Sequence, residues 1–501
     1  MKVLLIYPAP PRTHWPWGSF RSRWAPSGIM SIAACLLRDG HEVRVHICEE
    51  HLVKSTINWN ACDEALAALL RDFAPGIVGL SVVTPAVSET ARIAALARKV
   101  CGHKTLIVAG GPHATAVPEM LLSDCHALDA VAVGEGEATM CELALRGLQS
   151  DIAGLVIRDG DSMIRTAPRS PISNLDSLPP MPYDLLDMGY YTQAHRWMIR
   201  WLNLSCLNIR TSRGCTNACR FCAGHIVGGV GVRMHSVTSV VQQVAQAVER
   251  FGVRGIHFED DTVGADPARL IALSAALREA GLHRRIVWDC CLRVDQVSAE
   301  LLGEMKAAGC VQVEYGFESG SDRSLRSIGK AATVDLNRRA VELTRAAGLR
   351  IFADIIVGLP GETGRDIQAT VDFLRFARPE VINASRLFPL PGTALWDGLP
   401  DPDRAKLAWA DYAYFDRPDI GLNFTAMGDA QFERAFRRFM SHVVKPATKQ
   451  SMLRDWTAGD GDACGCAGRV STDDDRDFLR RRLRKFIITH PLAALRVPWR
   501  R

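Results

Sequence analysis

The sequence has no long apolar segment. Within its 501 residues, no uninterrupted apolar run approaches the ~20 residues that a membrane-spanning helix needs. The opening stretch from Met1 to Pro8 stops at a proline, and it is shorter than the apolar core of a secretory signal peptide. We therefore expect a cytoplasmic protein.

An excess of charge of one sign is also missing. Sixty basic residues nearly balance 55 acidic ones, and a net charge of +5 over this length gives no reason to expect a nucleic-acid partner. The 15 cysteines are odd in number and irregularly spaced, so they form no disulfide framework. A reducing compartment fits this cysteine usage.

Two common cofactor fingerprints are absent. No GxGxxG follows the first predicted strand, which disfavours dinucleotide binding. No second CxxC pair accompanies the CxxC at Cys219 and Cys222, whereas structural zinc sites usually combine two such pairs.

What the sequence does contain is a compact group of three cysteines. Cys215, Cys219 and Cys222 form CxxxCxxC in a loop that follows a predicted strand at Cys206–Arg210. Three thiolates this close can hold an iron–sulfur cube, which has four irons and would need a fourth ligand for complete protein ligation. No fourth cysteine lies nearby, so one iron is left open to a small molecule. A zinc site and three chance buried cysteines are the alternatives.

The chain divides into four predicted regions. Residues 1–150 alternate apolar strands with helices, a pattern typical of a doubly wound parallel sheet of the Rossmann-like kind. The proline-dense residues 151–200 are predicted to be a linker. Residues 201–398 contain six strand–helix rounds, fewer than the eight of a closed barrel, which predicts a partial (β/α)6 barrel. Residues 399–501 are predicted to be mostly helical with a basic tail.

The cysteine spacing, followed in order by motifs at successive strand ends, resembles the radical S-adenosylmethionine (radical SAM) family. This resemblance implies a [4Fe-4S] cluster on Cys215, Cys219 and Cys222 whose open iron holds SAM. It also assigns contacts with SAM to Phe221, Glu259, Asp261, Arg293, Glu318, Ser319 and Gly358. Structural roles are the alternatives: Glu259 and Asp261 could stabilise a helix N-terminus, and Arg293 could form an ion pair with Asp295 or Glu318.

The first region resembles the cobalamin-binding domain that precedes many radical SAM barrels. The resemblance assigns cobalamin contacts to strand-end residues, namely Ser81, Thr84, Gly110, Gly111, Gly134 and Glu135. The DxHxxG motif that supplies a cobalt-ligating histidine elsewhere is missing after the first strand, where His14 lies in a different context, so we expect no protein histidine below the cobalt. An ordinary Rossmann-like domain with turn glycines is the alternative.

Together these resemblances imply an enzyme that cleaves SAM reductively and uses cobalamin to methylate an unactivated carbon of a small or lipid-like metabolite. They imply no catalytic side chain beyond the cofactor ligands, and an electron donor such as flavodoxin or ferredoxin. A cyclase or rearrangement enzyme like the anaerobic magnesium-protoporphyrin ester cyclases is the first alternative. A non-catalytic cobalamin or redox sensor is the second.

Two features of the last region stay open at this point. Cys464 and Cys466 form a CxC that suits thiol or metal chemistry or an unstructured linker. The basic, then apolar tail from Arg480 onward suits peripheral contact with an anionic membrane, or a terminal helix docked on the barrel.

Overall fold

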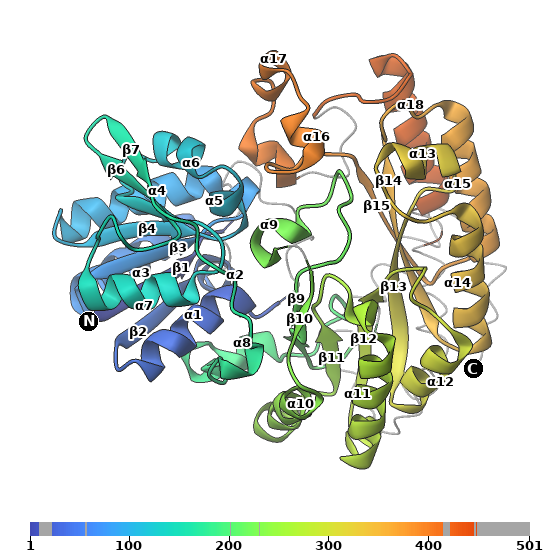
Figure 1. Cartoon of the computed structure of the whole chain (residues 1–501), viewed down its shortest axis with the longest axis horizontal. Helices are drawn as coiled ribbons and strands as arrows, with labels where there is room; N and C mark the ends of the chain where they lie inside the picture. The colour runs from blue at the N-terminus through green and yellow to red at the C-terminus, as the bar shows by residue number, and fades with distance from the viewer. Residues whose placement is uncertain are drawn as a thin grey trace.

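The computed structural model describes residues 1–9, 23–55, 58–200, 202–229, 231–413, 421–444 and 447. Two α/β units make up the chain: an N-terminal unit built on a seven-stranded sheet and a second unit built on a six-stranded sheet (Figure 1). His14, Cys464, Cys466 and the basic tail lie outside the described residues, so the predictions made for them stay predictions.

The N-terminal sheet has the order β2-β1-β3-β4-β5-β6-β7. Its first five strands pair in parallel, as predicted. They are β1 (Lys2–Tyr7), β2 (Glu42–Ile47), β3 (Ile77–Ser81), β4 (Leu106–Gly110) and β5 (Ala130–Ala132). The chain reverses its direction of winding between β1 and β3, and ligands of such sheets bind beside the strand ends at that point.

One part of the predicted linker belongs to this sheet instead. β6 (Leu155–Asp159) and β7 (Ser162–Arg165) form a hairpin that pairs antiparallel with β5, so the sheet continues beyond residue 150. Gly160-Asp161 forms the two-residue loop between the paired residues Asp159 and Ser162, and Gly160 has the positive φ (+57°) that the first position of such a hairpin turn favours. The prolines of residues 151–200 suggested that the N-terminal unit ends at residue 150, but its sheet continues to Arg165.

Helices cover both faces of this sheet and bury two apolar layers. They are α1 (Ser27–Arg38), α2 (Cys48–Lys54), α3 (Trp59–Phe73), α4 (Val87–Cys101), α5 (Pro112–Ala116), α6 (Pro118–Asp124) and α7 (Glu137–Arg146). Burial on both faces explains why the strands are continuous apolar runs rather than alternating ones.

The second sheet is the predicted partial barrel, with six parallel strands in the order β15-β14-β13-β12-β11-β8. Its strands are β8 (Cys206–Ile209), β11 (Gly255–Phe258), β12 (Val287–Leu292), β13 (Cys310–Glu318), β14 (Arg350–Val357) and β15 (Val381–Arg386). The main helices between them are α10 (Val237–Phe251), α11 (Pro267–Glu279), α12 (Ala299–Ala307), α14 (Val334–Ala346) and α15 (Gly364–Ala377).

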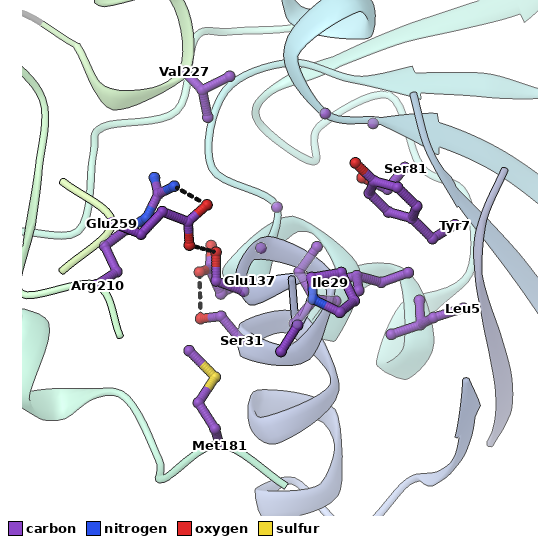
Figure 2. Close-up of a pocket in the computed structure, with 18 of the residues that line it drawn as sticks. Leu5, Tyr7, Ile29, Ser31, Ser81, Glu137, Met181, Arg210, Val227 and Glu259 are labelled. Carbon is purple, nitrogen blue, oxygen red and sulfur yellow. Dashed lines mark hydrogen bonds and ion pairs between the residues drawn. The ribbon is translucent and has the colours of Figure 1, made fainter. Parts of the chain in front are cut away.

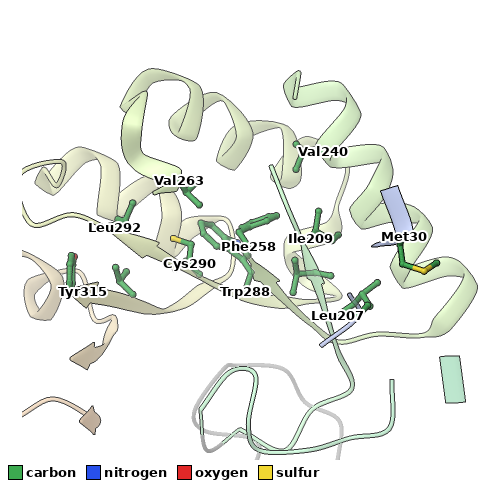
Figure 3. Close-up of a cluster of buried hydrophobic side chains, with 14 of the residues drawn as sticks. Met30, Leu207, Ile209, Val240, Phe258, Val263, Trp288, Cys290, Leu292 and Tyr315 are labelled. Carbon is green, nitrogen blue, oxygen red and sulfur yellow. The ribbon is translucent and has the colours of Figure 1, made fainter. Parts of the chain in front are cut away.

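Buried side chains from the strands and helices form one apolar layer between the barrel wall and its outer helices. Figure 3 shows Phe258, Trp288 and Cys290 from neighbouring strands packed among aliphatic side chains. The indole of Trp288 is fully buried, and its Nε1–H donates to the carbonyl of Ala308 at 2.9 Å, so burial leaves no polar atom of that ring unpaired.

The described part of the last region closes one end of the barrel. α16 (Ala394–Asp397) precedes this region, which includes α17 (Asp401–Arg404) and α18 (Asp429–Phe439), in agreement with a mostly helical region. Phe432 and Phe436 of α18 are buried against the barrel, and the guanidinium of Arg386 lies 4.9 Å from the Phe432 ring. Within the described residues, every helix is too short or too polar to cross a membrane.

Candidate functional site

A cavity of about 850 Å³ lies between the two α/β units. The N-terminal unit contributes strand-end residues such as Tyr7 and Ser81, and the barrel contributes the end of β11 and residues of the loop that bears the three cysteines. Figure 2 shows Tyr7 and Ser81 on one side of this cavity and Arg210 and Glu259 on the other. The two units that are predicted to bind cofactors therefore line one common cavity.

The cysteine loop is anchored by close backbone contacts. It leaves β8 through a short antiparallel ribbon of β9 (Ser212–Arg213) and β10 (Arg233–Met234). Gly214 has φ +89°, and a Cβ there would collide with the carbonyl oxygens of Gly228 and Gly231, so only glycine fits. On the far side of the loop, the Arg220 N–H donates to the Ile328 carbonyl at 2.9 Å.

The three thiols sit in surroundings that suit a cluster. Cys219 is buried, and Cys215 and Cys222 are half-buried. The Gly224 N–H lies 3.4 Å from Cys222 Sγ, and donors of this kind stabilise ligated sulfur. Burial raises the pKa of the Cys219 thiol, against the opposing charges of Lys330 and Arg293, so a cation is needed to hold this sulfur as a thiolate. These residues fit an iron–sulfur cluster.

Asp260 lies between two predicted SAM contacts, and its carboxylate fixes the start of the cysteine loop. Its Oδ1 accepts hydrogen bonds from the Thr211 N–H at 2.9 Å, the Ser212 hydroxyl at 2.8 Å and the Ser212 N–H. Burial raises the pKa of Asp260 to about 6, although these donors oppose the shift. In the sequence, the signal for a role of Asp260 in the site is its position between Glu259 and Asp261, the two predicted SAM contacts.

Glu259 and Asp261, which flank Asp260, line the cavity. Glu259 Oε2 accepts hydrogen bonds from Asn208 Nδ2 at 2.8 Å and from the Ser27 hydroxyl at 3.2 Å, and Oε1 lies 3.3 Å from Arg210. Burial raises the pKa of Asp261 and so favours its neutral form. A cation bound beside this carboxyl group would favour the charged form instead. Both acids therefore stay candidates for the SAM ammonium group.

Four other predicted SAM contacts lie elsewhere and already have partners. The Arg293 guanidinium forms a two-pronged ion pair with Asp295, with both distances 3.0 Å, and not with Glu318. Glu318 has φ +60°, and its carboxylate lies 2.6 Å from Lys330 Nζ. Ser319 is fully buried, and its hydroxyl forms a hydrogen bond with the hydroxyl of Thr370. Phe221 packs against a small apolar cluster of Ile328, Leu359, Leu387 and Leu395. None of these four lines the cavity as it is described.

Gly358, the last of that set, lies in a tight turn after β14. Its φ is +94°, and a Cβ there would lie 2.8 Å from the Phe432 ring. The buried carboxylate of Glu362 accepts the N–H groups of Gly358 at 2.7 Å and Leu359 at 3.3 Å. Burial raises the pKa of Glu362 to about 7 despite these donors.

This carboxyl predicts a pH effect on stability. The folded-state pKa of about 7 exceeds the ordinary value of 4.5, so the folded protein holds a proton that the unfolded chain releases. The resulting stabilisation is complete below pH 4.5 and is lost as pH rises to about 7, and it corresponds to at most about 3 kcal/mol. Glu362→Gln cannot titrate, so its apparent Tm relative to wild type should rise across this range. Equal pH profiles for the two proteins would contradict the shifted pKa.

The predicted cobalamin contacts fall into two groups. Ser81, Gly110, Gly111, Gly134 and Glu135 line the cavity. Thr84 does not line it. Its hydroxyl is 3.2 Å from His113 Nδ1, which ties the loop after β3 to α5.

The glycines at the ends of β4 and β5 leave space for a large flat ligand. At Gly111, with φ +95°, a Cβ would lie 2.9 Å from the Val82 backbone nitrogen, so the two strand-end turns touch because this residue has no side chain. His235, the histidine among the described lining residues, belongs to the barrel, and its Nδ1 is 3.0 Å from Asp176. Among the described residues, the lining includes no histidine of the N-terminal unit, and His14 lies outside the described residues, so the absence of a protein histidine below the cobalt stays a prediction.

Glu135 has a second role that its position in the sequence does not reveal. Its carboxylate lies 2.8 Å from Arg213 and 3.0 Å from Arg233, both from the ribbon of the barrel unit. Glu137 lies 2.7 Å from Arg213 and accepts the Ser31 hydroxyl at 2.6 Å. Burial alone would raise the pKa of Glu137, but Arg213 and Ser31 outweigh it and hold the pKa below its usual value. We call Glu135, Glu137, Arg213 and Arg233 the interdomain clamp.

Comparison with known proteins agrees with this arrangement. A family model of the radical SAM superfamily matches residues 209–374, and a model of the B12 binding domain matches residues 17–144. The first match spans the barrel strands from the end of β8 to α15. The second spans the N-terminal unit that lines the other side of the cavity.

Related sequences cover most of the chain. An uncharacterized methyltransferase of Pyrococcus horikoshii is 31% identical over 89% of this chain and 93% of its own length. The anaerobic magnesium-protoporphyrin IX monomethyl ester cyclase of Cereibacter sphaeroides is 26% identical over 80% of this chain and 64% of its own length.

A solved structure shares the fold. The radical SAM methyltransferase TsrM of Kitasatospora setae, solved with cobalamin and a [4Fe-4S] cluster, superposes with a TM-score of 0.63 at 21% identity, covering 79% of this chain and 73% of that one. Both units are thus found together in that fold. The chain belongs to the cobalamin-dependent radical SAM family of enzymes, whose cofactors are a [4Fe-4S] cluster, S-adenosylmethionine and cobalamin.

Proposed function

We propose that this enzyme transfers a methyl group from SAM, through cobalamin, to an unactivated carbon of a small or lipid-like molecule. The observation that carries the proposal is the shared cavity, because the glycine-rich strand ends of the N-terminal unit lie across it from the cysteine loop and from the carboxylates of Glu259 and Asp261. When bound, the cluster supplies the electron that cleaves SAM and the corrinoid supplies a transferable methyl group.

The protein's own residues provide binding, orientation and exclusion of water. Cys215, Cys219 and Cys222 would hold the cluster, while Asp260 and the Gly214 turn fix the loop that carries them. Glu259 and Asp261 would bind the SAM ammonium group. The interdomain clamp would hold the two units at a fixed separation, and so keep the reacting groups close and limit the entry of water.

The cavity predicts a specific effect of a glycine substitution. A methyl group at Gly111 would press on the Val82 backbone and force the two strand-end turns apart. Gly111→Ala is therefore expected to lower the corrinoid content of the anaerobically purified protein several-fold, measured by extraction and absorbance. Gly147→Ala is the matched control, since Gly147 has a similar backbone conformation (φ +70°, ψ −171°) with no atom within 4 Å of the added Cβ. An equal loss of corrinoid in both variants would contradict a role for this turn in the cavity.

The test of the reaction uses SAM labelled in its methyl group. Reduced, reconstituted enzyme is expected to release S-adenosylhomocysteine and 5′-deoxyadenosine, and the label should appear in a product formed from a small-molecule or lipid extract. Formation of 5′-deoxyadenosine with no label in any product would favour the cyclase reaction instead, which the relative from Cereibacter sphaeroides makes the second candidate. No cleavage of SAM by protein with a full cluster would favour a sensor.

Two partners remain part of this proposal. A small electron-transfer protein such as flavodoxin or ferredoxin would reduce the cluster. A lipid-like substrate would agree with membrane contact through the tail, and flotation of the full chain with anionic vesicles, compared with a chain that ends at residue 479, tests that contact.

A further inference from the structure

A second group of metal-ligating side chains lies in the N-terminal unit, away from the cysteine loop. His46 is on β2, Cys48 begins α2 and Cys62 is in α3. One ligand atom from each residue lies within 4.8 Å of the other two, and within the described chain no other three His, Cys, Asp or Glu residues meet this condition. All three are buried, with 1%, 3% and 5% of their surface exposed.

The imidazole of His46 points to a missing partner. Its Nε2 is buried and has no hydrogen-bond partner among the described residues. Buried polar atoms are nearly always paired, and an unpaired one calls for an explanation such as a bound ion. The His51 ring stacks on His46 at 4.1 Å and does not satisfy that nitrogen. Burial and the nearby His51 lower the pKa of His46 to about 3, so the ring stays neutral, which is the form that binds metals.

The thiols of Cys48 and Cys62 lie close enough to share a hydrogen bond. Cys62 Sγ lies 3.9 Å from the Cys48 carbonyl oxygen, a weak contact. The neighbouring Cys62 and then burial raise the pKa of Cys48 well above its usual value, so the Cys48 thiol keeps its proton when no ion is present. A divalent cation would replace those protons, because thiolates ligate metals and binding releases protons.

We propose that His46, Cys48 and Cys62 bind one zinc ion. Two sulfurs and one imidazole nitrogen are typical zinc ligands, and bonds of about 2.3 Å to sulfur and about 2.0 Å to nitrogen require ligand atoms as close as these. Three protein ligands leave a fourth position, which water fills in such sites. Binding of one Zn²⁺ releases one proton from each of the two thiols, so the charge of the site does not change.

The position of this site suggests what the ion does. It would join β2, α2 and α3 at the carboxyl edge of the sheet. Ile47, Glu49 and Glu50, which are adjacent to the ligands in the sequence, line the shared cavity. Zinc would therefore hold one wall of that cavity in place, without contact to the reacting atoms.

The test measures zinc in full-length protein purified anaerobically with its iron–sulfur cluster reconstituted. Plasma mass spectrometry is expected to find one zinc per chain after growth with zinc sulfate. X-ray absorption at the zinc edge, which iron does not disturb, should show two sulfur neighbours at about 2.3 Å. The double variant Cys48→Ser/Cys62→Ser should lose the zinc, and Cys125→Ser, which replaces another buried cysteine of the same unit, should keep it.

Three results would overturn the proposal. The first is wild-type protein without zinc. The second is zinc that the double variant retains, which would place it at the cysteine loop or the surface. The third is a Cys48–Cys62 disulfide in the anaerobic protein, found by mass spectrometry. Because the wild-type absorption spectrum decides the ligand set, the proposal stays testable even if the double variant does not fold.

Discussion

Replacing Cys219 with alanine is expected to remove the iron–sulfur absorbance near 400 nm and to lower the rate of SAM cleavage at least ~100-fold. Cys219 is the buried member of the three, and it lies in the electrostatic reach of Lys330 and Arg293. A cluster that loses one of its three protein ligands has a second open iron and dissociates in solution. Iron and sulfide analysis, together with 5′-deoxyadenosine formation, measures the effect. The same result is expected for Cys215→Ala and Cys222→Ala.

A buried cysteine outside the loop provides the control. Cys310 begins β13, is 1% exposed and lies 3.4 Å from the Gln312 carbonyl oxygen, a contact that a serine hydroxyl can also make. Cys310→Ser should therefore keep its iron and its SAM cleavage. Full iron content in Cys219→Ala would show that the loop does not ligate the cluster through this sulfur, and the radical chemistry would then lack its basis.

Replacing Arg213 with methionine is expected to destabilise the protein by about 3–5 kcal/mol, the usual penalty when one partner of a buried ion pair is removed. The side chains of Glu135 and Glu137 are each 5% exposed, and Arg213 itself is 14% exposed. Without the guanidinium, the buried carboxylates of Glu135 and Glu137 lose their shared partner, and only Arg233 is left to compensate Glu135. The urea midpoint and the corrinoid content should both fall, because the clamp joins the two walls of the cavity.

An exposed ion pair offers the matched comparison. Arg375 and Asp372 lie 2.9 Å apart with side chains 71% and 56% exposed, so Arg375→Met should change stability by no more than about 0.5 kcal/mol. Adding Glu137→Gln to Arg213→Met should recover part of the loss, since the amide carries no unpaired charge. A loss for Arg213→Met as small as that for Arg375→Met would mean that the clamp does not hold the two units together.

The fold was predictable where the periodicity of the sequence was strong. Six rounds of strand and helix predicted the partial barrel, and the structure has six parallel strands in this region, the first within one residue of its expected bounds. The β6–β7 hairpin was missed because its outer strand is polar and exposed, which weakens the apolar signal, although Gly160-Asp161 is a pair typical of a hairpin turn. The ribbon of β9 and β10 was missed because two-residue strands have no periodicity.

The site was predictable in its cysteines and less so in its charges. Spacing along the loop is a local property, so Cys215, Cys219 and Cys222 could be chosen without a structure. Whether a carboxylate at a strand end faces a ligand depends on partners that are distant in the sequence. Glu318 is paired with Lys330 and does not line the cavity. Glu135 lines the cavity but is paired with Arg213 and Arg233, and Glu259 and Asp261 line it from the barrel side.

The sequence by itself determined the two α/β units and the cysteine loop between a strand and a helix, because apolar periodicity and ligand spacing are properties of short segments. Only the tertiary structure decided which strand-end residues line the shared cavity, that Glu135 and Glu137 join the units, and that His46 meets Cys48 and Cys62. The physical reason is that charge pairing and metal ligation act over a few ångströms, between residues that only folding brings together.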